Sequence, residues 1–279
     1  RLEKIPQIRD FNAISGYGII AGQGPSYGMC IIKLKDWDER PEKSDGVQAV
    51  IGQIYALTAD IKKAQVYAMA PPMITGYGTG NGISMHLQDR AGGSTEDFFN
   101  VSQQFIGALN QRPEFERAVT TFNIAFPQYM VDIDAAKAKR AGISPTSILS
   151  TISGYYGGQY VSYFNRFSKV YRVIIQADPK YRLDAESLNN VFVRTDSGEM
   201  APVSQFATLT KTYGAEVLNR FNLYNSIAIN GTNASGYSTG EAIAAVRETA
   251  EQLLPKGYGY EFDGITREES QTTNNTAII

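Results

Sequence analysis

One order of elements occurs twice in this sequence, at positions far apart. The first copy has a strand pattern over residues 83–88, a Ser-x-x-Asp capping pattern at Ser94, an amphipathic helix pattern and Pro113. The second copy, residues 226–262, repeats strand, Ser238 capping box, helix and proline, and then returns as a strand. Two βαβ halves that share one antiparallel sheet form a ferredoxin-like unit. We therefore predict an α+β fold of the split βαβ type.

The long segment between the two halves has a character of its own. Residues 128–134 have the alternating pattern of a strand, with Asp132 and Asp134 on one face. Ser144 precedes a proline that begins a short helix. Residues 160–175 form an aromatic hairpin pattern, with Asn165-Arg166 near its tip. These patterns predict a separately folded α+β domain inserted into the first one.

The N-terminal region predicts a strand–helix–strand unit. An apolar run over residues 27–34 indicates a strand that buries Cys30, and Ser44 or Asp45 can cap a helix whose apolar face runs from Val47 to Ile61. Residues 66–70 predict a returning strand, and the glycine-rich residues 76–82 predict a linker to the next unit.

Composition excludes several classes of protein. Hydrophobic residues make up 43% and charged residues 19%, which is typical of a globular chain. The net charge of −2 gives no basic surface for nucleic acid or anionic lipid. A single cysteine, Cys30, cannot form an internal disulfide, and a single histidine, His86, excludes any site that needs two.

The stretch "SGYGIIAGQGPSYG" at residues 15–28 holds the spacing of a G-x-G-x-x-A dinucleotide fingerprint. That fingerprint needs a helix directly after its glycines, and here Gly22, Gln23, Gly24 and Pro25 lead into a strand instead. We therefore reject nucleotide binding. Two interpretations stay open: a hairpin connection that needs positive φ angles, or a mobile loop whose apolar tip contacts a ligand or partner.

No catalytic constellation is present in the sequence, so we predict no enzyme activity and no cofactor. His86 lies between Met85 and Leu87 on a strand, which indicates a structural role. Met69, Met73 and Met85 could hold a soft metal ion, although their irregular spacing favours a core or pocket lining.

Four further stretches suggest a family. The glycine stretch is followed by "YGMCIIKLKDWDERP", "VYAMAPPMITGYGTGNG", "GYYGGQYVSYFNRFSKVYRVIIQADPKYR" and "STGEAIAAVRETAEQLLP". Along essentially its whole length the chain resembles RND multidrug efflux transporters of the hydrophobe/amphiphile exporter (AcrB-like) group. It would be their second large periplasmic loop, which predicts that both ends are cut from a longer chain.

The resemblance implies a division into domains. Residues 1–77 would be the first C-terminal porter subdomain, without its opening strand and helix. Residues 78–125 and 222–266 would form the second porter subdomain, and residues 126–221 the docking domain inserted in it. Residues 267–279 would connect to a membrane helix.

The resemblance also implies the functional residues. The switch loop, which separates two drug pockets, would consist of Ser15, Gly16, Tyr17, Gly18, Ile19, Ile20, Ala21, Gly22, Gln23 and Gly24. Substrate would be bound by Phe11, Ala13, Met29, Ile31, Tyr67, Met69, Pro72, Asn123 and Asn230. The family's loop often carries two phenylalanines and an arginine, where this chain has Tyr17, isoleucine and Gln23 with one extra residue.

The function implied is the periplasmic drug-binding and docking part of a proton-driven pump in the inner membrane of a Gram-negative cell. Its partners would be amphiphilic small molecules, a periplasmic adaptor protein and an outer-membrane channel, and the full-length protein would be a homotrimer. Two alternatives stay open: a metal-ion efflux pump of the same fold, and an assembly module without an exposed ligand site.

Overall fold

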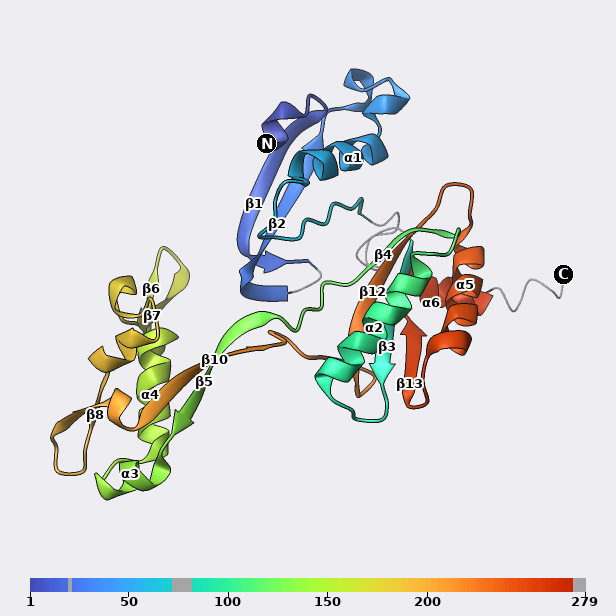
Figure 1. The fold of residues 1–279 in the computed structure, drawn as a ribbon. Coiled ribbons are helices and arrows are strands. Elements are labelled where there is room, and N and C mark those ends of the chain that lie inside the picture. Colours follow the sequence, from blue (N-terminus) through green and yellow to red (C-terminus); the bar gives the residue numbers. More distant parts are fainter. Residues whose placement is uncertain (20–21, 72–81, 273–279) are drawn as a thin grey trace. The chain divides into compact units, whose positions relative to one another are not determined.

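The computed structural model describes residues 1–19, 22–71 and 82–272. It contains two compact units, one of Arg1–Ile124 with Ala215–Ile279 and one of Ala125–Gly214 (Figure 1). Helices and strands occur in both units, which confirms the predicted α+β class. Within the described residues, no helix has the length and apolar character that crossing a membrane requires.

The first unit contains the predicted split βαβ sheet. Its strands are β3 (Ile83–Asp89), β4 (Phe115–Val119), β12 (Tyr224–Asn233) and β13 (Tyr258–Phe262). They lie in the order β13-β3-β12-β4, and every neighbouring pair is antiparallel. The order interleaves the two halves of the chain, as a ferredoxin-like unit requires. The short strand β11 (Asn219–Phe221) also pairs with β12.

The two crossover helices, α2 (Thr95–Leu109) and α5 (Thr239–Leu253), begin where the sequence predicts. The Ser94 hydroxyl accepts a hydrogen bond from the Asp97 N–H, and Ser238 forms a complete capping box with Glu241. Both helices end before a proline, because the pyrrolidine ring cannot continue the backbone hydrogen-bond pattern. Local sequence therefore fixes both ends of each helix.

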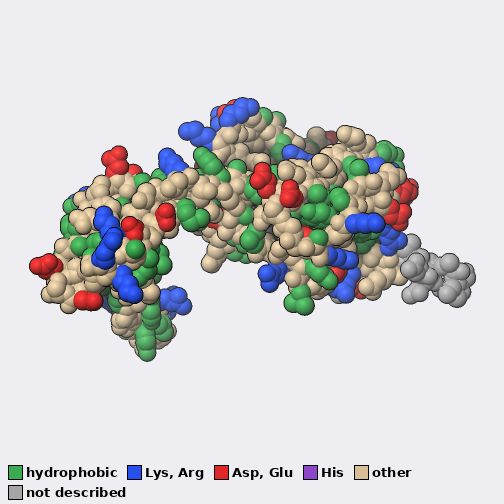
Figure 2. Space-filling model, turned by 60° about the horizontal axis from the view of Figure 1, so that its bottom comes forward, with side chains coloured by type: hydrophobic (Ala, Val, Ile, Leu, Met, Phe, Trp, Pro, Cys, Tyr) green, Lys and Arg blue, Asp and Glu red, His purple; other side chains and the backbone are tan. Residues whose placement is uncertain are grey.

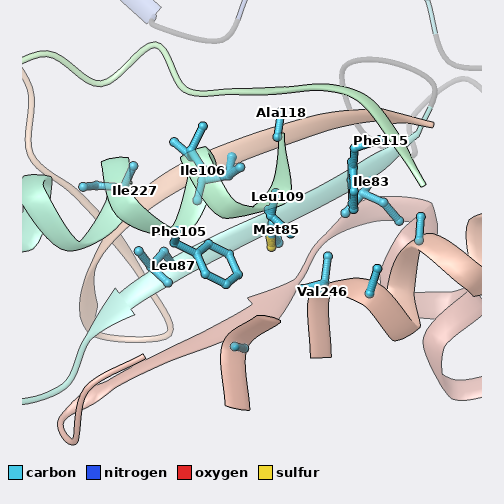
Figure 3. Packing of buried hydrophobic residues seen from close by; sticks show 14 of the residues in the cluster. Ile83, Met85, Leu87, Phe105, Ile106, Leu109, Phe115, Ala118, Ile227 and Val246 are labelled. Carbon is cyan, nitrogen blue, oxygen red and sulfur yellow. The ribbon is translucent and has the colours of Figure 1, made fainter. Parts of the chain in front are cut away.

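The main core lies between these helices and the sheet. Phe105 and Leu109 of α2 and Val246 of α5 lie beside Met85 and Leu87 of β3 (Figure 3). All five side chains are at most 1% exposed. Burial of this kind contributes about 25 cal/mol per Å² of apolar area, so this cluster holds the two distant halves together.

The N-terminal region consists of a long hairpin and one helix. Strands β1 (Ile8–Gly18) and β2 (Gly22–Leu34) pair antiparallel, and α1 (Val47–Thr58) contributes Val50 and Ile54 to a small core with Ile5. The helix begins after Gly46, without the predicted side-chain cap, and ends before Ile61.

The returning strand predicted over residues 66–70 is wrong. The structure has no strand there, because the backbone of Ala68 pairs with a side chain instead of a neighbouring strand. The Tyr55 hydroxyl accepts from the Ala68 N–H at 3.1 Å and lies 3.2 Å from the Ala68 carbonyl oxygen, to which it donates.

The second unit folds around its own core. It comprises β5 (Phe126–Ile133), α3 (Ala135–Arg140), α4 (Pro145–Tyr156), β6 (Gln159–Arg166), β7 (Lys169–Ile175), β8 (Phe192–Arg194), β9 (Met200–Pro202) and β10 (Ala207–Gly214). Ser144 caps α4 as predicted, and Ile148, Val191 and Val203 are fully buried. Asp134 does not share a strand face with Asp132, because it caps α3 by accepting from the Lys137 N–H.

Two predicted boundaries differ from the observed elements. Residues 215–221 lie in the first unit, because β11 pairs with β12 there. Helix α6 (Gly264–Thr272) occupies part of the predicted connector, whose residues 273–279 lie outside the described residues. On the face shown in Figure 2, basic and acidic side chains both occur on either unit.

Candidate ligand-binding hairpin

The glycine-rich stretch forms the end of the β1–β2 hairpin. Tyr17 lies opposite Gln23, and Gly18 lies opposite Gly22, so strand pairing runs up to the turn on both sides. Gly22 has a φ of +83°, a conformation that L side chains rarely adopt. A strand rather than a helix follows, which confirms the hairpin interpretation and leaves no helix N-terminus for a phosphate.

The ten predicted switch-loop residues are therefore mostly strand residues. Residues 15–18 belong to β1 and residues 22–24 to β2, with Ile19 between them. Gly16, with a φ of +79°, lies in a bulge between Ser15 and Tyr17. Ile20 and Ala21 lie outside the described residues.

The hairpin leaves several apolar side chains in water. Phe11 is 42% exposed and Ile31 is 56% exposed, and Ile19 beside the turn is exposed as well. Cys30 is also exposed, so the predicted buried thiol is wrong. The apolar run around Cys30 signalled burial, but in the structure this end of the hairpin extends beyond the small core that covers Ile32 and Leu34.

The strand register divides the predicted substrate-binding residues between two faces. Phe11 lies opposite Ile32 and Ala13 lies opposite Cys30, while Ile31 lies opposite Asn12 and Met29 opposite Ile14. Opposite residues of an antiparallel pair point to the same face, and successive residues point to opposite faces. Phe11 and Ala13 therefore share one face, and Met29 and Ile31 share the other.

The predicted residues after α1 do not gather in one place. Tyr67 is half-buried, and its hydroxyl donates to Thr120 O at 3.2 Å. Burial raises the pKa of Tyr67, so the hydroxyl stays neutral. Met69 is exposed, whereas Met85 packs in the core of the split βαβ sheet. Pro72 and Met73 lie outside the described residues. Of the three methionines, the two that the structure describes, Met69 and Met85, do not share one environment.

Asn123 lines a hollow that the sequence analysis missed, which we call the Glu216 hollow. Its empty volume is about 440 Å³, including the part open to solvent. It is lined by Tyr27, residues 120–123, Glu216, Val217, Asn219 and residues 226–228. Asn230 does not line it and lies further along β12, opposite Ser84 and Val119.

Glu216 joins the hairpin to this hollow. Its carboxylate accepts a hydrogen bond from the Ser26 hydroxyl at 2.9 Å. Burial, and then the neighbouring Glu216 carboxylate, raises the pKa of the Tyr27 hydroxyl. A Cβ on Gly24 would lie 2.5 Å from Glu216 Oε1 and 2.8 Å from the Tyr27 ring, so these side chains would have to shift to admit one. No local sequence signal marks Glu216, which is distant from the hairpin along the chain.

His86 packs as a structural residue. Its ring stacks on Phe221 with centroids 4.1 Å apart, and its Nε2 lies 3.4 Å from Asp263 Oδ2.

The whole chain, residues 1–279, matches the model of the AcrB/AcrD/AcrF family. It is 33% identical over 98% of its length to the solvent-resistant pump membrane transporter SrpB of Pseudomonas putida, covering 26% of that protein. It is 36% identical over 92% of its length to the probable efflux pump membrane transporter TtgB of Pseudomonas putida KT2440, covering 24%. It is 31% identical over 95% of its length to the multidrug resistance protein MdtF of Escherichia coli K12, covering 26%. The chain thus spans about a quarter of the length of these relatives. With a family model matched from end to end, this chain belongs to the AcrB/AcrD/AcrF family of RND efflux transporters.

Proposed function

We propose that this chain forms the drug-binding and docking part of an efflux transporter that exports amphiphilic compounds. Family membership supports this, because relatives are named as solvent, toluene and multidrug transporters. The observation that carries the proposal is the β1–β2 hairpin, which leaves Phe11, Ile19 and Ile31 exposed. Large apolar side chains exposed on both faces of one hairpin favour contact with a ligand or partner there.

The hairpin is proposed to separate two binding compartments. Phe11 and Ala13 would contact ligand on one face, and Met29 and Ile31 on the other. Gly16 and Gly22 have positive φ angles, and glycine moves between such conformations at low cost. A change in the hairpin would then alter the affinity of the two compartments, which is how a pump moves its cargo.

The second unit is proposed to dock onto an adaptor protein and an outer-membrane channel in the periplasm, within a homotrimer driven by protons. Every residue of β6 is exposed, including Tyr160, Tyr163 and Phe164. Aromatic side chains are enriched at protein interfaces, so the β6–β7 hairpin is the part of this unit best suited to a partner.

A hydrophobic dye tests the ligand site. We expect a fluorescent naphthylamine dye to bind the 279-residue chain, and Phe11→Ala to weaken that binding about fivefold because apolar contact area is lost. Phe192→Ala, which removes an exposed phenylalanine from the second unit, is the matched control. Equal effects of the two substitutions, or no binding by the wild type, would contradict the proposal.

A further inference from the structure

The β6–β7 hairpin of the second unit carries positive charge with no negative charge beside it in the sequence. Arg166, Lys169 and Arg172 lie in its strands, and no aspartate or glutamate occurs in residues 159–175. Among the ion pairs of the described ranges, none involves these three side chains. The hairpin is therefore a local basic surface, although the net charge of the chain is −2.

The basic side chains lie on both faces of the hairpin. Arg166 lies opposite Lys169, and Arg172 lies opposite Tyr163. Lys169 and Arg172 are three positions apart on β7, so they point to opposite faces, because successive strand residues alternate. A flat anionic lipid surface would contact only one of these faces. An extended strand beside β7 reaches both, because its own side chains alternate in the same way.

Aromatic rings accompany the charges on each face. Phe164 stacks on Tyr171 with ring centroids 5.4 Å apart, on the face that holds Lys169. On the other face, the guanidinium carbon of Arg172 lies 5.9 Å from the centroid of the Tyr160 ring. These four aromatic and basic positions are exposed on both strands. Aromatic and arginine side chains are enriched at protein interfaces, so this composition favours a protein as the partner.

The β7 edge of the hairpin is open to a further strand. Within the described residues β6 and β7 form a two-stranded sheet, so no third strand pairs with either edge. Helix α4 packs against β6, which leaves β7 as the more open edge. The backbone N–H and C=O groups of an edge strand can pair with an added strand. Opposite charges on neighbouring strands stabilise such pairing.

We propose that the β7 edge of this hairpin binds an extended acidic segment of a partner protein as a third strand. This rests on the proposed docking role of the second unit and adds the chemistry of the partner. The segment would place one carboxylate beside Lys169 and a second, three positions along and on the other face, beside Arg172. Its apolar side chains would cover the exposed aromatic rings of the hairpin.

Three short peptides of one pattern test the charge. TVEITEVT, TVQITQVT and TVKITKVT carry acidic, neutral and basic side chains at two positions with the spacing of Lys169 and Arg172. Each is labelled with a fluorophore and titrated against the 279-residue chain by fluorescence polarisation. We expect the acidic peptide to bind about fivefold more tightly than the neutral one, through two exposed ion pairs, and the basic peptide to bind most weakly. Added salt should reduce the preference, because it screens exposed charges.

A double variant assigns the preference to the hairpin. Lys169→Gln with Arg172→Gln should remove the preference and leave binding of the neutral peptide unchanged. Lys139→Gln with Arg140→Gln makes the same charge change on α3 of the same unit and should keep the preference, as the matched control. Thermal melts report the folding of each variant separately. A preference that survives the hairpin variant would overturn the assignment to β7.

Methylated peptides test the strand pairing. N-methylation of alternate residues removes the N–H donors along one edge of the peptide, so one of the two alternate sets should abolish binding. Equal binding by both sets and the unmethylated peptide would overturn strand addition. Binding to phosphatidylglycerol vesicles through Lys169 and Arg172, without any preference among the peptides, would overturn the protein partner. Absence of binding by every peptide would overturn this inference alone, because the dye titration tests the ligand site independently.

Discussion

The split βαβ sheet and the β1–β2 hairpin are both antiparallel, yet the sheet buries its apolar side chains and the hairpin leaves several of them exposed. In the sheet, Leu87 and Ile229 are fully buried beneath α2 and α5. In the hairpin, Phe11 and Ile31 point to opposite faces and both remain exposed. A strand with one buried face has its register fixed by the core, whereas a ribbon exposed on both faces is held mainly by its own hydrogen bonds. The first region is stabilised by its buried core, and the second leaves apolar side chains accessible for contact.

A matched pair of phenylalanines gives the largest expected difference. Phe105→Ala in α2 should lower the free energy of unfolding by about 3–5 kcal/mol, because it leaves a cavity in the main core. Phe11→Ala on the hairpin should cost less than about 1 kcal/mol, because that side chain is already partly in water. Urea unfolding followed by circular dichroism measures both. Similar losses of unfolding free energy in the two variants would show that the sheet and the hairpin do not differ in this way.

A pair of glycines makes the same comparison at the backbone. A Cβ on Gly231 would lie 2.6 Å from the buried ring of Phe115, so Gly231→Ala should cost about 1–3 kcal/mol through overpacking. No atom of the described residues lies within 4 Å of a Cβ on Gly22, so Gly22→Ala should cost only about 1 kcal/mol, from its positive φ. Thermal melts should rank Gly231→Ala as the more damaging. The reverse order would mean that the hairpin turn is the tighter of the two.

Tyr55→Phe tests what holds residues 66–70 in place of a strand. The substitution removes the hydroxyl that pairs with both backbone groups of Ala68, and should cost about 1 kcal/mol. Hydrogen exchange should become faster at the Ala68 amide, while the amides of β3 keep their protection. Unchanged exchange at Ala68 would show that this hydroxyl does not hold the segment.

The smallest expected effect is a pH dependence at the α5 cap. Hydrogen bonds from the Ser238 backbone and then its hydroxyl lower the pKa of Glu241 below its ordinary value of 4.5. A carboxylate with a lowered pKa stabilises the folded state above the unfolded pKa, and this stabilisation is lost as pH falls through the folded pKa. Glu241→Gln should therefore lower the melting temperature at neutral pH and make little difference in strong acid. A difference in melting temperature between the two proteins that persists in strong acid would show that the effect comes from packing instead.

The split βαβ sheet was predictable because each sequence signal that defines its helices and strands is local. Ser94 and Ser238 cap their helices, prolines follow their ends, and apolar residues recur at helical or strand spacing. The predictions for Cys30 and for residues 66–70 are wrong because an apolar run alone does not determine burial or strand pairing. Whether a covering layer or a neighbouring strand exists is a property of the tertiary structure.

Of the candidate site, only the hairpin geometry was predictable. The glycines and the apolar tip mark residues 15–24, but Glu216 and Ser226 carry no signal of their own. They meet Tyr27 only because β11 and β12 bring distant residues to the hairpin. Long-range pairing of this kind cannot be inferred from spacing along one sequence.

The paired strands β5 and β10 have a consequence for how the chain folds. Phe126 lies opposite Gly214, so the second unit begins and ends at neighbouring points. Once that unit has folded, the long intervening segment no longer counts as an open loop between β4 and β12, and the entropy of closing it falls. During synthesis the β3-α2-β4 half is made before the half that completes its sheet. Early folding of the inserted unit would bring the two halves close together in space.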